Sequence, residues 1–421
     1  MKMQQKEHAW MGLGAALVVC AGGLWNPPAA QAAGFANTAQ SGTATGMGGV
    51  ATANADEPNA NFYNPAAMVF SQGFSAYVGP TLIKPSVSYE GQGGEEQTEP
   101  ALFPPPNVNL TLPFGEQYAV GLGVTLPWGL AIRWPDNWVG RENFRAQQLQ
   151  TINVNPNFAY KVPGMDLGLA VGVQAMYSTI TQERTVILRD DLEVPVLLGG
   201  QGFGVGATAA AFYKLNSQWS MGLNYRSAVN LNYEGRAHFG EEVEGTPFEQ
   251  RFVDQDITTE LTVPHTVNLG LGYQATEALW VGLDLNYMTW STYDRIEINF
   301  DEQSPEGEPG ESEPPTVVES NWNDALAVRL GAQFAITDAL KARVGFAYDV
   351  TPVPDETVGP SLPDNNRTVG ALGLGYEVAG FRADVAYQYI YLPTREIRNG
   401  SVDGDYQLSS HLVGINVGYG F

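Results

Sequence analysis

The chain has 421 residues and carries 45 aspartates and glutamates against 21 lysines and arginines, which gives a formal net charge of −24. Nucleic-acid binding and docking on an anionic membrane surface both need clustered Lys and Arg side chains, so this charge balance argues against both functions. Charged residues make up 16% of the chain and aromatic residues 11%, which excludes a disordered acidic protein.

The N-terminus has the pattern of a secretory signal peptide, which we predict to comprise residues 1–32. It has a basic start, an apolar stretch and a cleavage site, formed by Lys2 and Lys6, by Trp10–Leu24 and by Ala30-Gln31-Ala32. An N-terminal membrane helix is the alternative, but about 15 apolar residues are too few to cross a bilayer. Because Cys20 is the only cysteine, the exported chain would contain no disulfide bond.

Residues 33–72 precede the first expected strand and lack a regular alternation of apolar and polar residues. Small residues dominate part of this segment, as in 42–49, but larger apolar side chains follow: Phe62, Tyr63, Met68, Val69 and Phe70. Disordered tails lack such residues. We therefore predict a packed N-terminal plug, with a disordered periplasmic tail as the alternative.

From residue 73 to residue 421 the dominant sequence pattern has a period of two. In Leu279–Tyr287 and in Phe381–Tyr391 every second residue is apolar, and most residues between them are polar or small. This pattern is typical of β-strands with two different faces. A soluble β-sandwich with one wet face fits it, and so does a transmembrane barrel that is apolar towards lipid and polar towards its lumen.

Connection lengths favour the barrel over the sandwich. Short turns alternate with long, irregular segments, as in outer-membrane barrels with short periplasmic turns and long external loops. The turns are expected at 114–117, 162–165, 215–218, 275–277, 337–339 and 378–380, and the loops at about 90–105, 127–150, 184–202, 234–256, 301–320, 351–366 and 393–404. We therefore predict an all-β fold: a 14-stranded antiparallel transmembrane β-barrel over residues 73–421, with the plug at 33–72, in the outer membrane of a Gram-negative cell.

Two groups of side chains in this barrel have expected positions. Aromatic residues near strand ends are expected at the membrane interfaces: Tyr89, Trp128, Trp290, Tyr391 and Tyr419. Basic residues on the lumen face are expected to form ion pairs with Asp349 and Asp384; they are Lys341, Arg343 and Arg382.

Short motifs distributed along the chain resemble those of the FadL family of outer-membrane transporters for hydrophobic compounds. They occur in order at Ala33-Gly34-Phe35, 56–66, 128–131, 138–141, 290–291 and 362–367. The resemblance runs from residue 33 to residue 421. It implies passive uptake of hydrophobic molecules, either long-chain fatty acids or hydrocarbons. A ligand would pass from an external groove to a pocket inside the barrel and leave sideways through an opening in the wall.

The resemblance also implies candidate ligand-binding residues. Phe35 matches an aromatic residue of the N-terminal segment that contacts ligand in the family. Arg184 resembles a family position where an arginine faces the pocket; the alternative is that it only pairs with Glu183 or loop acids. Asn323 stands where fatty-acid members have a second basic residue. This departure weakens the fatty-acid interpretation and leaves room for a neutral ligand.

Two further candidate sites concern the gate and the wall. Asn64-Pro65-Ala66 resembles the family's plug motif, and Pro and Asn can hold such a turn in one conformation; a purely structural turn is the alternative. The third strand contains Gly121 and Gly123 and runs through Leu126 to Pro127, which cannot donate to the strand ladder. These residues are the candidate lateral opening. The alternative is that Pro127 only ends the strand. Asp364 and Arg367 resemble a family motif that we interpret as structural.

Two other functions are weighed against transport of hydrophobic molecules. One is a general porin for polar solutes, and the other is a lipid-modifying barrel enzyme that uses His265 with a strand serine; we expect no enzyme. His238, His265 and His411 are scattered without metal-ligand spacing, so no metal site is expected, and no cofactor is expected either.

The expected partners follow from this location. They are a hydrophobic small molecule, outer-membrane lipid and lipopolysaccharide, and the outer-membrane assembly machinery, with the protein itself a monomer. Acidic residues crowd the external loops, six of them between Asp301 and Glu313. They either solvate these loops or hold divalent cations against lipopolysaccharide.

Overall fold

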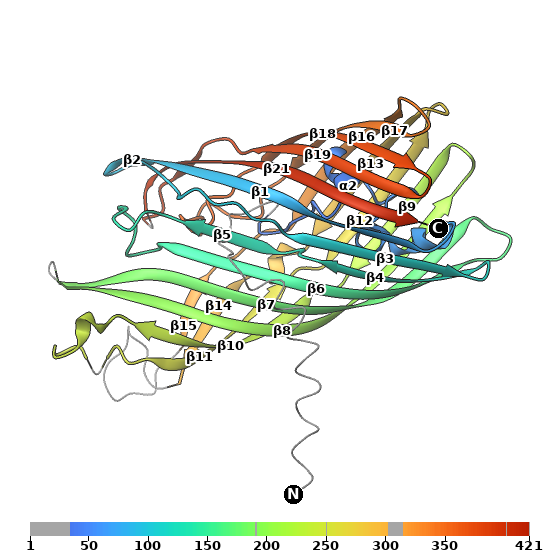
Figure 1. Ribbon diagram of the computed structural model, residues 1–421. Coiled ribbons are helices and arrows are strands. Elements are labelled where there is room, and N and C mark those ends of the chain that lie inside the picture. Colours follow the sequence, from blue (N-terminus) through green and yellow to red (C-terminus); the bar gives the residue numbers. More distant parts are fainter. Residues whose placement is uncertain (1–33, 190–191, 250, 302–314, 401, 421) are drawn as a thin grey trace, which may run out of the picture.

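The computed structural model describes residues 34–189, 192–249, 251–301, 315–400 and 402–420, and it shows a closed antiparallel β-barrel (Figure 1). The first strand, β1 (Ser75–Gly91), pairs with the last, β21 (Gly404–Gly420), from Ser75 opposite Gly420 to Gly91 opposite Gly404. The predicted 14-stranded barrel is confirmed. The expected signal peptide and most of the acidic segment near residue 301 lie outside the described residues.

Several of the 14 crossings of the wall are interrupted and therefore consist of two strands. In chain order they are β1; β3 (Pro106–Phe114); β4 (Tyr118–Thr125) with β5 (Gly129–Arg133); β6 (Ala146–Lys161); β7 (Leu167–Arg189); β8 (Leu192–Lys214); β9 (Trp219–Arg226) with β10 (Val229–Phe239); β11 (Gln255–Val263) with β12 (Thr266–Gln274); β13 (Leu279–Met288) with β14 (Arg295–Phe300); β15 (Thr316–Glu319) with β16 (Ala325–Ala335); β17 (Leu340–Asp349); β18 (Arg367–Val378); β19 (Phe381–Tyr391); and β21. Strands β2 (Gly94–Gln97) and β20 (Arg395–Ile397) extend the loop ends. Every expected short turn falls between two successive crossings.

The outer face of the barrel is apolar, as lipid contact requires. In β19, Val385, Tyr387 and Tyr389 are exposed, whereas the alternate residues Asp384, Ala386 and Gln388 are buried towards the lumen. In water such a continuous apolar surface would drive aggregation, but in a bilayer it is the stable arrangement. The barrel is thus built for the outer membrane. The described part of the chain has no helix with the length and apolarity to cross a membrane.

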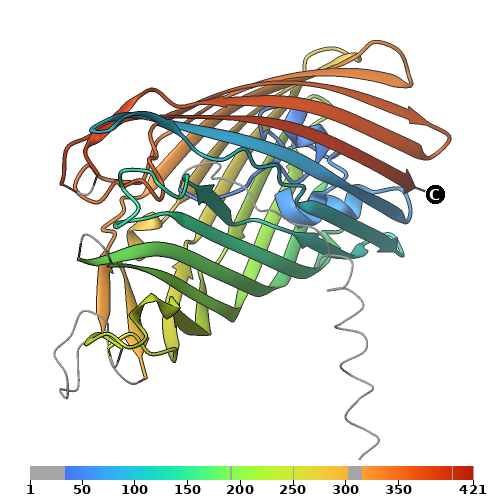
Figure 2. The ribbon, with the colours of Figure 1, turned by 60° about the vertical axis from the view of Figure 1, so that its left-hand side comes forward.

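The segment that precedes β1 lies inside the barrel, where Figures 1 and 2 show it in blue, enclosed by the strands. It contains two short α-helices, α2 (Gly42–Gly46) and α3 (Ala60–Tyr63), followed by the 3-10 helix η1 (Pro65–Phe70). Ser41 caps α2 by accepting a hydrogen bond from the Ala44 N–H, and Asn64 caps η1 by accepting from the Ala66 N–H. We call residues 34–74 the plug.

Glycines on the inner face of the wall make room for the plug backbone. A Cβ atom on Gly222 would lie 1.9 Å from the Thr52 carbonyl oxygen, and one on Gly345 would lie 2.0 Å from the Met47 carbonyl carbon. Real Cβ atoms do not approach other atoms so closely. Glycine at these strand positions therefore allows the plug backbone to approach the strand backbone closely.

Candidate functional site

The candidate site begins at a break in the barrel wall between β4 and β5. Strand β4 pairs with β3 and β6, whereas β5 pairs with β6 alone among the described strands. Between them Leu126, Pro127 and Trp128 turn inward and are buried. The pairing with β3 thus ends at the candidate opening, whereas the pairing with β6 continues on both sides of the break.

The plug supplies hydrogen bonds to the backbone of this break. Ala36 lies opposite Trp128 in an antiparallel bridge, flanked by a bond from the Asn37 N–H to the Pro127 carbonyl (2.7 Å) and one from the Gly129 N–H to the Phe35 carbonyl (2.9 Å). The Gln40 side-chain amide donates to the Leu126 carbonyl (2.8 Å). Polar backbone groups in a membrane wall must be satisfied. Here the plug satisfies the Leu126 and Pro127 carbonyls and the Gly129 N–H, while Thr151 of β6 bonds the N–H and the carbonyl of Trp128.

Phe35 stands at the centre of an aromatic cluster inside the barrel. Its ring centroid lies 4.7 Å from that of Trp290, 5.7 Å from Trp322, 5.8 Å from Tyr293 and 6.2 Å from Trp128. The four partners all come from strand interruptions, with Trp290 in the 3-10 helix η3 (Trp290–Thr292) between β13 and β14. Such interruptions re-aim side chains that a regular strand would point outward.

The position of Phe35 is fixed by its neighbour Gly34 and by a buried ion pair. Gly34 has φ of +68°, and a Cβ there would lie 2.5 Å from the Trp322 ring, so only glycine fits. Its carbonyl accepts from Arg367 Nη2 (2.9 Å), and its N–H donates to Asp364 Oδ2 (3.4 Å). Arg367 is in turn bonded to Asp364. The pair thus holds the start of the plug in place.

The larger of the two cavities that contact the aromatic cluster lies against Phe35 and measures about 170 Å³. Its walls are mainly aliphatic and aromatic, and they include Phe35, Leu130, Leu149, Ile180, Leu261 and Ile298. No lysine, arginine or histidine of the described chain lines this cavity; the charged residues at its edge are Glu260 and Glu319, both exposed. Such a space suits an apolar molecule or the apolar part of an amphiphile.

A smaller cavity of about 50 Å³ lies between the plug and the wall break. Ala36, Pro127 and Trp128 line one part of it, and Arg226 and Arg329 line another. The larger cavity contacts Phe35, Tyr293 and Trp322, and the smaller one contacts Trp128. The aromatic cluster therefore borders both cavities: Trp128 lies against the smaller one, and the other three residues just named lie against the larger one.

The candidate ligand residues lie at different distances from these cavities. Phe35 lines the larger cavity. Arg184 follows the lining residues Ile180 and Gln182 at alternate positions of β7, but it does not line the cavity itself. Asn323 directly follows Trp322, is exposed, and donates through its backbone N–H to the Pro352 carbonyl (2.8 Å). The structure therefore brings Phe35, but not the other two, to the cavity surface.

The candidate gate and wall residues lie where the plug meets the wall. The Asn64 amide donates to the carbonyls of Thr52 (2.8 Å) and Ala211 (3.0 Å). These bonds link the start of η1 to an earlier part of the plug and to β8. Pro65 opens η1 and Ala66 is bonded to Asn64. Gly121 and Gly123 face Asn61, and a Cβ on Gly121 would lie 2.1 Å from Asn61 Oδ1. Both glycines therefore make space for the plug beside the break.

Two expectations about side chains need correction. Tyr391 and Tyr419 lie exposed on the outer face, but Tyr89, Trp128 and Trp290 are buried inside. Trp128 and Trp290 lie in strand interruptions, which re-aim side chains, whereas Tyr89 continues the row of buried residues of β1 with Val87. The interior ion pairs of Arg343 and Arg382 with Asp384 are confirmed. However, Asp349 pairs with Arg329, and Lys341 contacts Glu377.

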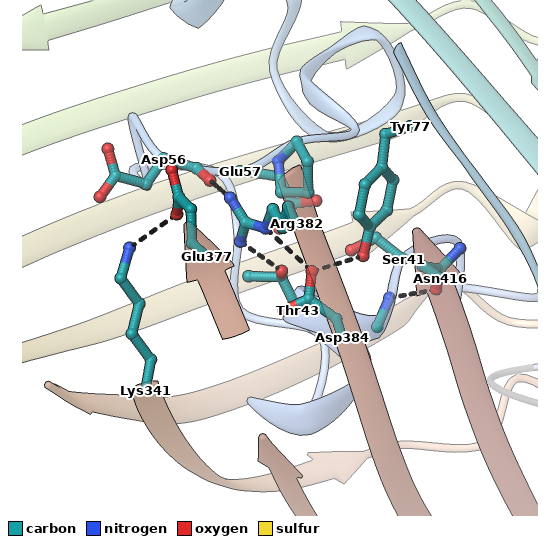
Figure 3. A network of polar contacts seen from close by, with 12 residues as sticks. Ser41, Thr43, Asp56, Glu57, Tyr77, Lys341, Glu377, Arg382, Asp384 and Asn416 are labelled. Atoms are coloured by element: carbon teal, nitrogen blue, oxygen red, sulfur yellow. Dashed lines mark hydrogen bonds and ion pairs between the residues drawn. The ribbon is translucent and has the colours of Figure 1, made fainter. Parts of the chain in front are cut away.

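The confirmed ion pairs belong to a network that ties the plug to the last strands (Figure 3). Asp384 accepts hydrogen bonds from Arg343 Nη1 (2.6 Å), Arg382 Nε (2.8 Å) and the Tyr77 hydroxyl (3.0 Å). Arg382 also donates to Thr43 Oγ1 (2.8 Å) and to the Asp56 carbonyl (3.2 Å) in the plug. Glu57 lies beside this network.

Glu57 should make the stability of the protein depend on pH. Its side chain accepts from the Asn59 N–H (3.0 Å) and is only 4% exposed, and burial raises its pKa from 4.5 to about 7. As pH rises from about 4.5 to 7, the unfolded chain ionises first, so folding stability falls by roughly 3 kcal/mol and stays lower above pH 7. In thermal unfolding followed by tryptophan fluorescence, Glu57→Gln should match the wild type near pH 5 and exceed it near pH 8. An equal difference at both pH values would contradict this prediction.

Sequence reasoning gave no ligand role to several residues that the structure places at the site. Trp290, Tyr293 and Trp322 form the aromatic cluster with Phe35, and Arg226 lines the smaller cavity. For the two tryptophans, the sequence offered one signal of a special position: each stands next to polar residues that interrupt a strand crossing. That signal does not distinguish the lumen from the lipid face.

Comparison with known proteins agrees with this architecture. A family model described as "Outer membrane protein transport protein (OMPP1/FadL/TodX)" matches residues 26–421. A "Long-chain fatty acid transport protein" of Escherichia coli O6:H1 is 24% identical over 400 residues, which covers 85% of this chain and 87% of that protein.

Two solved structures show the same fold. A Pseudomonas aeruginosa FadL homologue superposes with a TM-score of 0.82 at 18% identity, covering 93% of this chain and 100% of that one. The Ralstonia pickettii toluene transporter TbuX gives a TM-score of 0.69 at 16% identity, covering 90% and 98%.

Proposed function

This chain belongs to the outer membrane protein transport protein family (OMPP1/FadL/TodX), and from that membership we propose that it mediates passive uptake of hydrophobic molecules across the outer membrane. The observation that carries the proposal is the apolar cavity inside a lipid-facing barrel, beside a plug that hydrogen-bonds to a break in the wall. Long-chain fatty acids and toluene are the substrates named for two of the relatives. We propose no catalytic step.

The proposed route runs from the larger cavity past the aromatic cluster to the wall break. A ligand enters the larger cavity from the external side and then displaces Phe35. Movement of Phe35 pulls on Ala36 and Asn37, which are bonded to the break. Release of these bonds opens a lateral path at Leu126–Trp128, and the apolar ligand partitions into the bilayer. No energy source is needed, because partitioning into lipid is favourable for an apolar molecule.

Specific observations disfavour the two other functions. A general porin needs an open aqueous lumen, whereas the plug fills this one against glycines of the wall. A barrel hydrolase would need a free histidine base. Nδ1 of His265 is bonded to the Ala228 N–H (3.1 Å) and to the Tyr225 hydroxyl (2.9 Å), which fixes the ring as part of the break between β11 and β12.

The surroundings of the protein are proposed in the same way. We propose a monomer that is inserted by the outer-membrane assembly machinery and sits among outer-membrane lipid and lipopolysaccharide. The described residues contain no cluster of three or more potential metal ligands.

Filling the larger cavity should reduce ligand binding without unfolding the barrel. Leu149 lines this cavity and is 2% exposed, so Leu149→Trp places an indole in the space that we assign to the ligand. Affinity for a labelled alkane in detergent solution should fall about tenfold or more, as the ligand loses apolar contact area. Leu330→Trp on the lipid face, where Leu330 is 50% exposed, is the matched control and should bind normally. Normal binding by both variants would place the ligand elsewhere.

A further inference from the structure

Arg226 is a buried arginine at the end of β9, beside the wall break. It is 6% exposed, lines the smaller cavity and lies opposite Thr266 of β12 in the strand register. The same cavity is lined by Pro127 and Trp128. A positive charge is thus held next to the proposed exit.

The contacts of Arg226 differ from those of every other buried arginine that the structure describes. The others each contact an aspartate: Arg329 with Asp349, Arg343 with Asp384, Arg367 with Asp364, and Arg395 with Asp355. Arg226 instead donates to the neutral oxygens of Gln174 (3.0 Å) and Asn155 (2.9 Å). Longer bonds of 3.4 Å run to the plug carbonyls of Asn61 and Phe62, and the Phe62 ring lies 4.6 Å away. No described carboxylate forms an ion pair with it.

Two donors beside this cavity lack an acceptor in the described structure. The Arg226 Nε–H and the Thr266 hydroxyl are both buried without a hydrogen-bond partner among the described residues. A buried charge with neutral partners and an unmade hydrogen bond is costly. An anion in the cavity would offset this cost. A carboxylate forms the strongest such contact because it accepts charge-assisted bonds from a guanidinium.

We infer that Arg226, with Thr266, binds the carboxylate of a long-chain amphiphile in the smaller cavity while its tail crosses the aromatic cluster. This inference rests on the proposed function and names the headgroup class. The two cavities then divide the ligand by chemistry: the larger one, without a basic side chain in its described lining, holds the apolar part, and the smaller one holds the anion. A neutral hydrocarbon would use the larger cavity alone.

The test compares two ligands with the same chain, hexadecanoate and hexadecan-1-ol, at about pH 9, where the carboxyl group is ionised. Equilibrium binding to the full-length mature protein in detergent is measured for the wild type, Arg226→Gln and Arg226→Lys. Arg226→Gln should weaken hexadecanoate binding about 10- to 100-fold and change hexadecan-1-ol binding less than about twofold. Arg226→Lys should restore part of the hexadecanoate affinity, since it keeps the charge.

Further variants keep the test decisive if Arg226→Gln does not fold. Gln174→Glu keeps the arginine and supplies a carboxylate inside the protein, so it should lower hexadecanoate affinity and spare hexadecan-1-ol. Arg236→Gln removes an exposed arginine further along the same crossing, paired with Asp256 at 3.3 Å, and controls for the loss of one charge.

The outcomes separate this inference from the proposed function. Equal loss of both ligands in Arg226→Gln and in Gln174→Glu would show a structural role and overturn the inference. Loss of hexadecanoate selectivity in Arg184→Gln but not in Arg226→Gln would assign the headgroup to the end of β7 and overturn it as well. Failure of the folded wild type to bind either ligand would contradict the proposed function itself.

Discussion

A disulfide bond between positions 36 and 128 should stop uptake of hydrophobic molecules while the barrel stays folded. Ala36 and Trp128 form an antiparallel pair whose hydrogen bonds lie on either side of it, between Asn37 and Pro127 and between Gly129 and Phe35. In such a pair the Cα atoms are about 4.5 Å apart, which is within the range that a disulfide bridges. The bond would hold the plug on the wall break and prevent the lateral path from opening.

The same protein provides the control, because the bond is reversible. In proteoliposomes or cells, uptake of a labelled alkane by the Ala36→Cys, Trp128→Cys double variant should fall at least about tenfold after oxidation, since a covalent bond replaces contacts of a few kcal/mol. A reducing agent should restore it to the level of the Trp128→Cys single variant. Cys20 does not interfere, since it lies in the expected signal peptide. Unchanged uptake with the disulfide shown to be formed would place the exit elsewhere.

A side chain at Gly345 should displace the plug and make the barrel leak. The Cβ of Gly345→Val would lie 2.0 Å from the Met47 carbonyl carbon and 2.2 Å from the Gly48 nitrogen, which are backbone atoms that cannot rotate away. Overpacking of this kind costs about 1–3 kcal/mol or more, so the plug should shift from β17. In planar bilayers the wild type should conduct small ions poorly and Gly345→Val should show a clear increase in conductance.

A matched variant lies on the neighbouring strand. Gly370 of β18 pairs with Phe346 and is exposed, and a Cβ atom added there would have no other atom within 4 Å, so Gly370→Val adds the same side chain without touching the plug. It should keep the wild-type conductance. High conductance of the wild type itself would favour the porin alternative, and an equal effect of both variants would show that the wall, not the plug, was disturbed.

The barrel could be predicted from sequence because its rules are local. Alternation in Phe381–Tyr391 places Asp384 on the lumen face, and that placement was sufficient to predict its ion pairs with Arg343 and Arg382. Turn length gave the number of crossings. Both signals depend on neighbouring residues and need no knowledge of tertiary contacts.

The aromatic cluster could not be predicted in this way. Trp128 and Trp290 follow strand interruptions, and an interruption resets the alternation, so the lumen and lipid faces can no longer be assigned by counting. Arg226 was missed for a related reason. Arg226 differs from the other buried arginines because it has no acidic partner in the described structure. Its partners come from strands far away in the sequence, so they cannot be identified by counting along the chain.

The plug's contacts with the last strands determine the order in which the molecule can be assembled. The Gly42 N–H donates to Asn416 Oδ1, which is 374 residues away, and Thr43 is bonded to Arg382 of β19. Contacts of such sequence separation form only when nearly the whole chain is present. These bonds of the plug therefore cannot form before β19 and β21 are in place. Seating of the plug and closure of the β1–β21 seam depend on the same C-terminal strands.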